Sequence, residues 1–129
     1  MTLRILIADD DRDTTSTLQA ILEDEGHVVH AVHDGAEVVK TARLVRPDAI
    51  VLDIQMPSKS GYAIAEELKA LYYASRPPML IAISGKWTQE ADRWLAQRVG
   101  FDHHFTKPAA PRALVAALSR LCAPTAPPG

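Results

Sequence analysis

The sequence is poor in cysteine, in long apolar runs and in excess charge of either sign. Cys122 is the single cysteine, which excludes an internal disulfide and a thiolate metal site made by this chain alone. No run of about 18 apolar residues occurs, so we expect no membrane span, and the residues after Met1 do not resemble a signal peptide. A net charge of −2 argues against binding to nucleic acid or anionic membranes through bulk charge. These absences favour a cytoplasmic protein.

The chain is long enough for one domain with its own core. It has 129 residues, of which 47% are hydrophobic and 23% are charged, and both fractions are ordinary for a globular protein. We expect a single domain over residues 1–122. Three prolines fall in the last seven residues, and we expect residues 123–129 to form a disordered tail.

Short apolar runs alternate with longer helical patterns along the whole chain. The runs predict strands over residues 3–8, 27–32, 49–52, 79–83 and 101–106. The 3.6-residue periodicity predicts helices that end near Glu25 and Val45, and further helices over residues 61–73, 88–99 and 109–121. Five successive strand–helix units predict an α/β fold, in which a parallel sheet carries helices on both faces.

Polar residues follow four of the five predicted strands directly. Asp9 and Asp10 follow the first strand, Asp53 the third, Ser84 the fourth and Lys107 the fifth. Ligands of open α/β sheets bind outside the carboxyl ends of the strands. We therefore expect these five side chains to converge on one site.

The residue types at this expected site indicate phosphoryl transfer. Clustered carboxylates repel one another unless a cation neutralises them, and hard oxygen ligands suit Mg²⁺ or Mn²⁺. A carboxylate can attack phosphorus to give an aspartyl phosphate. A metal ion, a lysine ammonium and a hydroxyl can then stabilise the charge on the transferring group.

Four segments carry a family resemblance in the expected order: residues 5–11, residues 51–57 with Gly61 downstream, residues 82–85 and residues 105–108. On these segments the chain resembles the receiver domain of bacterial response regulators and hybrid histidine kinases. The resemblance extends from residue 3 to about residue 121, and residues 100–104 look most like receivers of hybrid kinases. It implies a doubly wound, five-stranded parallel sheet with strand order 2-1-3-4-5, which is the flavodoxin-like (βα)5 arrangement.

The resemblance also implies a metal site. Asp10 matches the family residue that binds Mg²⁺ directly, and Asp9 matches its partner, which often acts through water. Asp53 matches the phosphoacceptor and is a further metal ligand. Gln55 falls where the family supplies a backbone carbonyl to the metal, so its side chain is not required for this role.

The same resemblance assigns the residues that hold and sense the phosphoryl group. Lys107 matches the lysine that pairs with phosphoryl oxygens, and the bond to Pro108 is often cis in this family. Ser84 matches the switch hydroxyl. His104 departs from the family, because Tyr or Phe usually stands there as a rotating switch residue. An imidazole at this position is smaller and can titrate near neutral pH.

The resemblance implies a signalling domain rather than an enzyme, although self-phosphorylation from small donors and self-dephosphorylation are expected. The phosphoryl group would come from a sensor histidine kinase or a histidine phosphotransfer protein. Output would pass through protein–protein contacts, without nucleic acid or membrane, from a monomer or a phosphorylation-linked dimer.

Three other functions fit these residues less well. A pseudo-receiver keeps the fold without phosphorylation, but such domains usually lose an acidic residue or the lysine, and this chain has both. A haloacid-dehalogenase-like phosphatase needs a second aspartate two residues after the nucleophile, where this chain has Gln55. A flavin-binding protein of the same strand order would need a Ser/Thr/Gly-rich loop after the first strand, where three aspartates would repel the FMN phosphate.

Five histidines raise the question of a second metal site. They fall near the second predicted strand (His27, His30 and His33) and near the fifth (His103 and His104). Those strands are expected at opposite edges of the sheet. We therefore expect the two groups not to meet.

Overall fold

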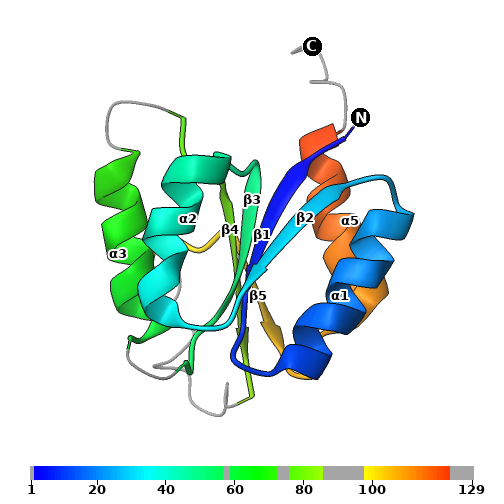
Figure 1. The fold of residues 1–129 in the computed structure, drawn as a ribbon, viewed down its shortest axis with the longest axis horizontal. Coiled ribbons are helices and arrows are strands. Elements are labelled where there is room, and N and C mark those ends of the chain that lie inside the picture. Colours follow the sequence, from blue (N-terminus) through cyan, green and yellow to red (C-terminus); the bar gives the residue numbers. More distant parts are fainter. Residues whose placement is uncertain (1, 57–58, 73–75, 86–97, 123–129) are drawn as a thin grey trace.

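The structure, a computed structural model, describes residues 2–56, 59–72, 76–85 and 98–122 (Figure 1). The strands are β1 (Arg4–Ala8), β2 (Val28–Val32), β3 (Ala49–Asp53), β4 (Met79–Ser84) and β5 (His103–Thr106). The helices are α1 (Arg12–Asp24), α2 (Val38–Val45), α3 (Gly61–Leu71) and α5 (Pro111–Cys122), and η1 (Gly35–Glu37) is a 3₁₀ turn.

The described strands form one parallel five-stranded sheet in the order β2-β1-β3-β4-β5. The predicted fold class and strand order are therefore confirmed. β3 is buried along its whole length, because helices cover both faces of the central strands and no residue there faces water. β2 and β5 are the edge strands, so the two groups of histidines lie at opposite edges of the sheet, as predicted.

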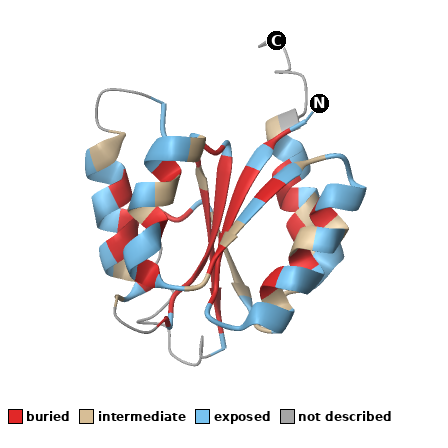
Figure 2. Ribbon diagram, viewed as in Figure 1, coloured by how far each residue is buried: buried red, intermediate tan, exposed pale blue. Residues whose placement is uncertain are grey.

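Alternating side chains of the strands supply two separate cores, one on each face of the sheet. Helices α1 and α5 cover one face and α2 and α3 cover the other (Figure 1). In β1, Ile5 and Ile7 belong to the α1/α5 core, whereas Leu6 and Ala8 belong to the α2/α3 core. Figure 2 shows the buried residues along the strands and on the inward faces of the helices. Each large aliphatic side chain buried in this way contributes about 1.5–3 kcal/mol.

The helix and strand ends differ from the predictions by a few residues, for identifiable reasons. Asp34 accepts a hydrogen bond from the Ala36 N–H and starts η1, which leads into α2. β5 begins at His103 because the Asp102 carboxylate, rather than a backbone carbonyl, accepts the Leu80 N–H at 2.8 Å. α1 ends at Asp24, close to the predicted end near Glu25, and Gly26 follows with a φ of 95°, a left-handed conformation that favours glycine.

Two predicted segments lie mainly outside the described residues. Of the helix predicted over residues 88–99, only residues 98 and 99 are described, and both are helical. The predicted tail, residues 123–129, is not described. Among the described residues, no helix is both long and apolar enough to span a membrane.

Candidate functional site

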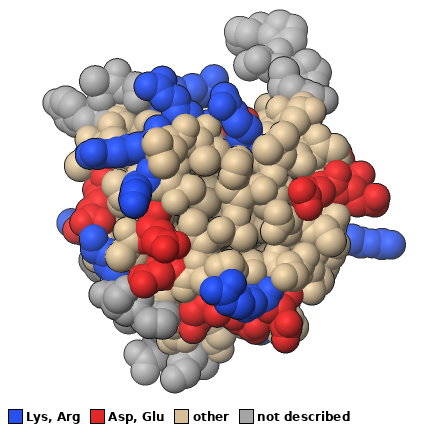
Figure 3. All heavy atoms as spheres, viewed as in Figure 1, with Lys and Arg blue, Asp and Glu red and all other residues tan. Residues whose placement is uncertain are grey.

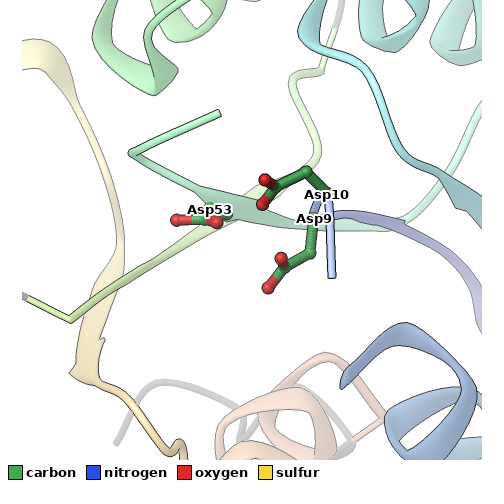
Figure 4. A group of neighbouring side chains, drawn as sticks. All are labelled: Asp9, Asp10 and Asp53. Atoms are coloured by element: carbon green, nitrogen blue, oxygen red, sulfur yellow. The ribbon is translucent and has the colours of Figure 1, made fainter. Parts of the chain in front are cut away.

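Three carboxylates meet at the carboxyl ends of two neighbouring strands. Asp9 and Asp10 follow β1, and Asp53 ends β3, whose Leu52 pairs with Ala8 of β1. One carboxylate oxygen from each aspartate lies within 4.8 Å of the other two, and Figure 4 shows the three side chains side by side. Asp9 and Asp53 are only 2% and 3% exposed, whereas Asp10 is exposed. Two carboxylates of the cluster are therefore buried, and the third lies at the solvent edge.

Lys107 joins the two buried carboxylates. Its Nζ lies 2.9 Å from Asp53 Oδ2 and 3.0 Å from Asp9 Oδ2. Its backbone N–H donates to the carbonyl of Ser84 at 2.9 Å, which fixes the start of the β5–α5 loop beside the end of β4. The Lys107–Pro108 peptide bond is cis. The ammonium is thus a counter-ion shared by two strands' carboxylates.

The other oxygen of each buried carboxylate is held by the backbone. Asp9 Oδ1 accepts the Asp11 N–H at 2.9 Å, and Asp53 Oδ1 accepts the Gln55 N–H at 3.0 Å. Both contacts bridge a side chain to the amide two residues later, which is the local turn that aspartate favours. These bonds limit rotation of the carboxylates, so their second oxygens are directed at a common position.

Burial and charge act against each other in this cluster. Burial above all, together with the Asp53 charge, raises the pKa of Asp9, although the Asp11 N–H and Lys107 partly offset the effect. Burial alone would lower the pKa of Lys107, but its hydrogen bonds to Asp53 and Asp9 outweigh burial, and the pKa is raised. The site therefore favours an added positive charge, either as a proton or as a cation.

The donor set matches a hard divalent cation. It consists of three carboxylates within reach of one ion, and Mg²⁺ is commonly bound through one or two carboxylates, water and phosphate oxygens. Among the described residues, no other group of three or more His, Cys, Asp or Glu side chains has this geometry. The residues present are thus suited to Mg²⁺ or Mn²⁺.

Two further predicted site residues, Ser84 and Gln55, lie close to Asp53 in the sheet or along the chain. Ser84 is 3% exposed at the end of β4, one residue beyond Ile83, which pairs with Asp53. Gln55 is exposed and follows Asp53 in the β3–α3 loop.

His104 does not join the carboxylates. It is half-buried in β5, where it pairs with Ala82. Its neighbour Phe105 packs against the α1/α5 core, so strand alternation directs His104 to the opposite face of the sheet.

One feature beside the cluster was not predicted. A hollow of about 580 Å³ adjoins Lys107, between α1 and the loop that leads into α5. On α1 its lining includes Thr14, Thr17 and Leu18, which lie at the spacing of one helix face. Pro108 and Pro111 line the other side. The spacing on α1 was the available signal, but only the fold brings the two prolines opposite it.

Known proteins share both this sequence pattern and this fold. Residues 5–119 match the response regulator receiver domain family. The 14.6 kDa protein in the sodA1 3′ region of Leptolyngbya boryana is 32% identical over 118 residues, which are 92% of this chain and 88% of that protein. The alkaline phosphatase synthesis transcriptional regulatory protein PhoP of Bacillus subtilis is 34% identical over 112 residues. That match covers 87% of this chain but 45% of PhoP, so the chain spans less than half of this relative.

A solved structure shows the same fold. It is the Saccharomyces cerevisiae receiver domain of the response regulator Ssk1, crystallised with the histidine phosphotransfer signaling protein Ypd1, and it superposes with a TM-score of 0.84 at 20% identity. The match covers 92% of this chain and 87% of that one. The segment that matches the receiver domain family, residues 5–119, contains every residue of the carboxylate cluster and Lys107. The chain therefore belongs to the response regulator receiver domain family of two-component signalling.

Proposed function

We propose that this receiver domain accepts a phosphoryl group on Asp53 in a Mg²⁺-dependent reaction, with Asp9, Asp10 and Asp53 as metal-site residues. The observation that carries the proposal is the contact of Lys107 with both buried carboxylates, at 2.9 Å and 3.0 Å. A buried carboxylate that faces an ammonium and two further acids has the groups that phosphoryl transfer to aspartate requires.

Each residue of the cluster has a distinct task in this proposal. Asp53 is the nucleophile, and its backbone contact to the Gln55 N–H keeps one oxygen fixed while the carboxylate reacts. Bound Mg²⁺ would supply charge neutralisation on the transferring group. Asp10 directly, Asp9 through water and the Gln55 carbonyl complete the proposed metal ligands.

The transfer needs no oxidant, reductant or further substrate besides the phosphohistidine. An Asp53 oxygen forms a bond to phosphorus as the P–N bond of a phosphohistidine breaks, and the imidazole nitrogen keeps the bonding electron pair. The product is an aspartyl phosphate, and the released imidazole takes a proton from water or its own protein. Lys107 would then pair with a phosphoryl oxygen, and the Ser84 hydroxyl would donate to another.

The phosphodonor would be a sensor histidine kinase or a histidine phosphotransfer protein. Family membership supports this class of partner, and so does the solved complex of a structurally similar receiver domain with Ypd1. The hollow bounded by Thr14, Leu18 and Pro111 adjoins Lys107. A donor seated there would bring its phosphohistidine to the open edge of the carboxylate cluster.

The consequences of phosphorylation are also proposals. Ser84 and His104 would respond as the switch pair, and output would follow through protein contacts by a monomer or a phosphorylation-linked dimer. Self-phosphorylation from small donors and self-dephosphorylation are expected of the same site. The resemblance of residues 100–104 to receivers of hybrid kinases stays a prediction.

The test is intact mass spectrometry after incubation with acetyl phosphate and Mg²⁺, with a phosphorylated histidine phosphotransfer protein as a second donor. We expect one added phosphoryl group, which Asp53→Asn abolishes and EDTA prevents. An adduct of equal yield in Asp53→Asn would move the acceptor elsewhere. No adduct from either donor, and no Mg²⁺-dependent binding of beryllofluoride, would contradict the proposal.

A further inference from the structure

Basic side chains gather at the end of the molecule opposite the carboxylate cluster. The Arg4 guanidinium donates from Nη1 to the carbonyl of Val45, the last residue of α2, at 3.1 Å. Arg46 follows directly in a left-handed conformation with a φ of 53°. Figure 3 shows Lys and Arg side chains clustered at the top of this view, whereas acidic side chains lie on both flanks and, beside further basic ones, at the bottom. We call this region the basic end.

Two adjoining hollows define the basic end more closely. One, of about 370 Å³, is lined by Ala42, Arg43, Arg46, Leu71 and Tyr72, between the last turns of α2 and α3. The other, of about 510 Å³, includes Arg4, Arg76 and Asp48 in its lining. The linings of the two hollows together contain four arginines and one carboxylate. Asp48 is already engaged, because its Oδ2 accepts the backbone N–H of Arg4 at 2.8 Å.

The smaller hollow has an apolar floor as well as a basic rim. Leu71 and Tyr72 are half-buried and pack against the α2/α3 core, while Arg43 and Arg46 are exposed at the rim. A volume of about 370 Å³ lies at the small end of the range for ligand pockets and has room for an apolar side chain. Arg46 and Tyr72 line the same hollow, so the basic and apolar elements belong to one surface.

An unusually exposed leucine extends this surface along α2. Leu44 is 79% exposed, and among the described residues only Leu44 and Val28 are exposed large hydrophobic side chains. Lys40 lies one turn before Leu44 on the same helix. An occupant of the hollow that continued over the outer face of α2 would therefore meet another cation and then an apolar contact.

We propose that the basic end is a docking surface for an acidic protein segment that inserts an apolar side chain between α2 and α3. Carboxylates of the segment pair with Arg43, Arg46 and Lys40, and its apolar side chain packs on Leu71 and the Tyr72 ring. The surface lies at the opposite end of the sheet from Asp53, so such a partner can bind without obstructing phosphoryl transfer.

A nucleic acid suits this surface less well. The apolar floor and exposed Leu44 contribute nothing to phosphate contacts, which depend on charge. The carboxylate of Asp48 stands among the arginines, and the chain as a whole carries a net charge of −2, so a long polyanion would be repelled beyond the patch. A short acidic segment interacts with the patch alone.

The test uses a fluorescein-labelled peptide with a central phenylalanine flanked by glutamates, followed by fluorescence anisotropy with the whole chain. Arg43→Gln combined with Arg46→Asn removes two rim charges, and asparagine tolerates the left-handed backbone at position 46. Arg12→Gln combined with Arg112→Gln, both exposed in the first turns of α1 and α5 at the other end of the molecule, is the control with the same change of net charge. We expect about tenfold weaker binding for the first variant, weakening with salt for the wild type, and no change for the control.

Changes in the peptide test the surface without altering the protein. Replacing its phenylalanine with serine, or its glutamates with glutamines, is expected to weaken binding. The proposal is overturned if the peptide does not bind, if both double variants bind it equally, or if an oligo-dT strand of equal charge binds as tightly. Unchanged labelling of the Arg43/Arg46 variant by acetyl phosphate is expected, so failure at the basic end is distinguishable from failure at Asp53.

Discussion

Lys107 and Asp53 form the contact that connects the two halves of the carboxylate site. The lysine follows β5 at the sheet edge, the aspartate ends central strand β3, and their charged atoms meet at 2.9 Å. The same ammonium reaches Asp9 at 3.0 Å. A metal ion bound by the cluster would share carboxylates with Lys107, so the lysine and the cation partly substitute for each other in neutralising the site.

Without Lys107, the repulsion between the buried carboxylates of Asp9 and Asp53 should destabilise the fold. For Lys107→Gln we expect the free energy of unfolding without metal to fall by about 1–2 kcal/mol, because Asp9 and Asp53 lose their shared counter-ion. Part of this loss should be recovered in Mg²⁺. Urea unfolding in EDTA and in Mg²⁺ measures both effects.

A second lysine provides a matched control. Lys59 pairs with Glu67 at the surface, and their side chains are 34% and 44% exposed. Lys59→Gln should therefore change the free energy of unfolding by less than about 0.5 kcal/mol. Equal losses in the two variants would show that the Lys107 contacts have no special weight.

Asp9 should cost stability when it ionises in the absence of metal. Its raised pKa means that the folded protein holds the proton more tightly than the unfolded chain does. This contribution to stability is fully present below the ordinary value of 3.8 and is lost as pH rises through the raised pKa. Asp9→Asn should therefore be more stable than the wild type at pH near 7 in EDTA, and asparagine can still accept the Asp11 N–H.

The pH dependence separates this effect from a general change in packing. The advantage of Asp9→Asn should shrink as pH falls toward the ordinary pKa, because the wild-type carboxyl then becomes neutral too. Glu66→Gln, which removes an exposed acid from α3, should show no such pH dependence. A constant advantage at every pH would refute the electrostatic explanation.

Asp10 should matter for metal binding rather than for folding. It is exposed, so Asp10→Asn should leave stability in EDTA within about 0.5 kcal/mol of the wild type. Mg²⁺ at about a hundred times its Kd should stabilise the wild type by about 2.7 kcal/mol, and much less of this should remain in the variant. Thermal unfolding across a Mg²⁺ titration measures the difference. Equal Mg²⁺ stabilisation of both proteins would remove Asp10 from the proposed ligand set.

The sequence was sufficient for the fold because local patterns and tertiary packing agree along most of the chain. The apolar run that ends at Asp53 could only be a strand buried on both faces, and five such units leave few topologies. The residues of the carboxylate cluster were predictable because strand ends converge at one edge of a parallel sheet.

Features that depend on side chains distant in sequence were not predictable. The start of β5 is set by the Asp102 carboxylate on the Leu80 amide, and hydrophobic periodicity carries no signal for such a bond. Lys107 was expected near Asp53, but its bridge to Asp9 depends on the path of the β5–α5 loop. The basic end joins Arg4, Arg46 and Arg76 from three segments, and none of these segments is unusually basic by itself.

Gly61 should be the most sensitive small residue near the site. A Cβ added there would lie 2.7 Å from Ile54 Cα and 3.1 Å from the carbonyl oxygen of Asp53. Gly61→Ala must therefore move α3 away from the end of β3, and the Gly61 N–H bond to the Ile54 carbonyl, 2.9 Å long, would be strained. We expect a loss of about 1–3 kcal/mol in the free energy of unfolding and slower labelling of Asp53 by acetyl phosphate.

Gly85 provides the comparison, because it also adjoins a strand end but has open space around it. A Cβ at Gly85 meets no heavy atom within 4 Å, and its backbone is not among the described positive-φ glycines. Gly85→Ala should thus change stability by less than about 0.5 kcal/mol. Urea unfolding of both variants distinguishes the close approach at Gly61 from a general effect of alanine at a loop. Equal stability of Gly61→Ala and Gly85→Ala would mean that the contact between α3 and the end of β3 is looser than the structure describes. This contact could then not hold Asp53 in place.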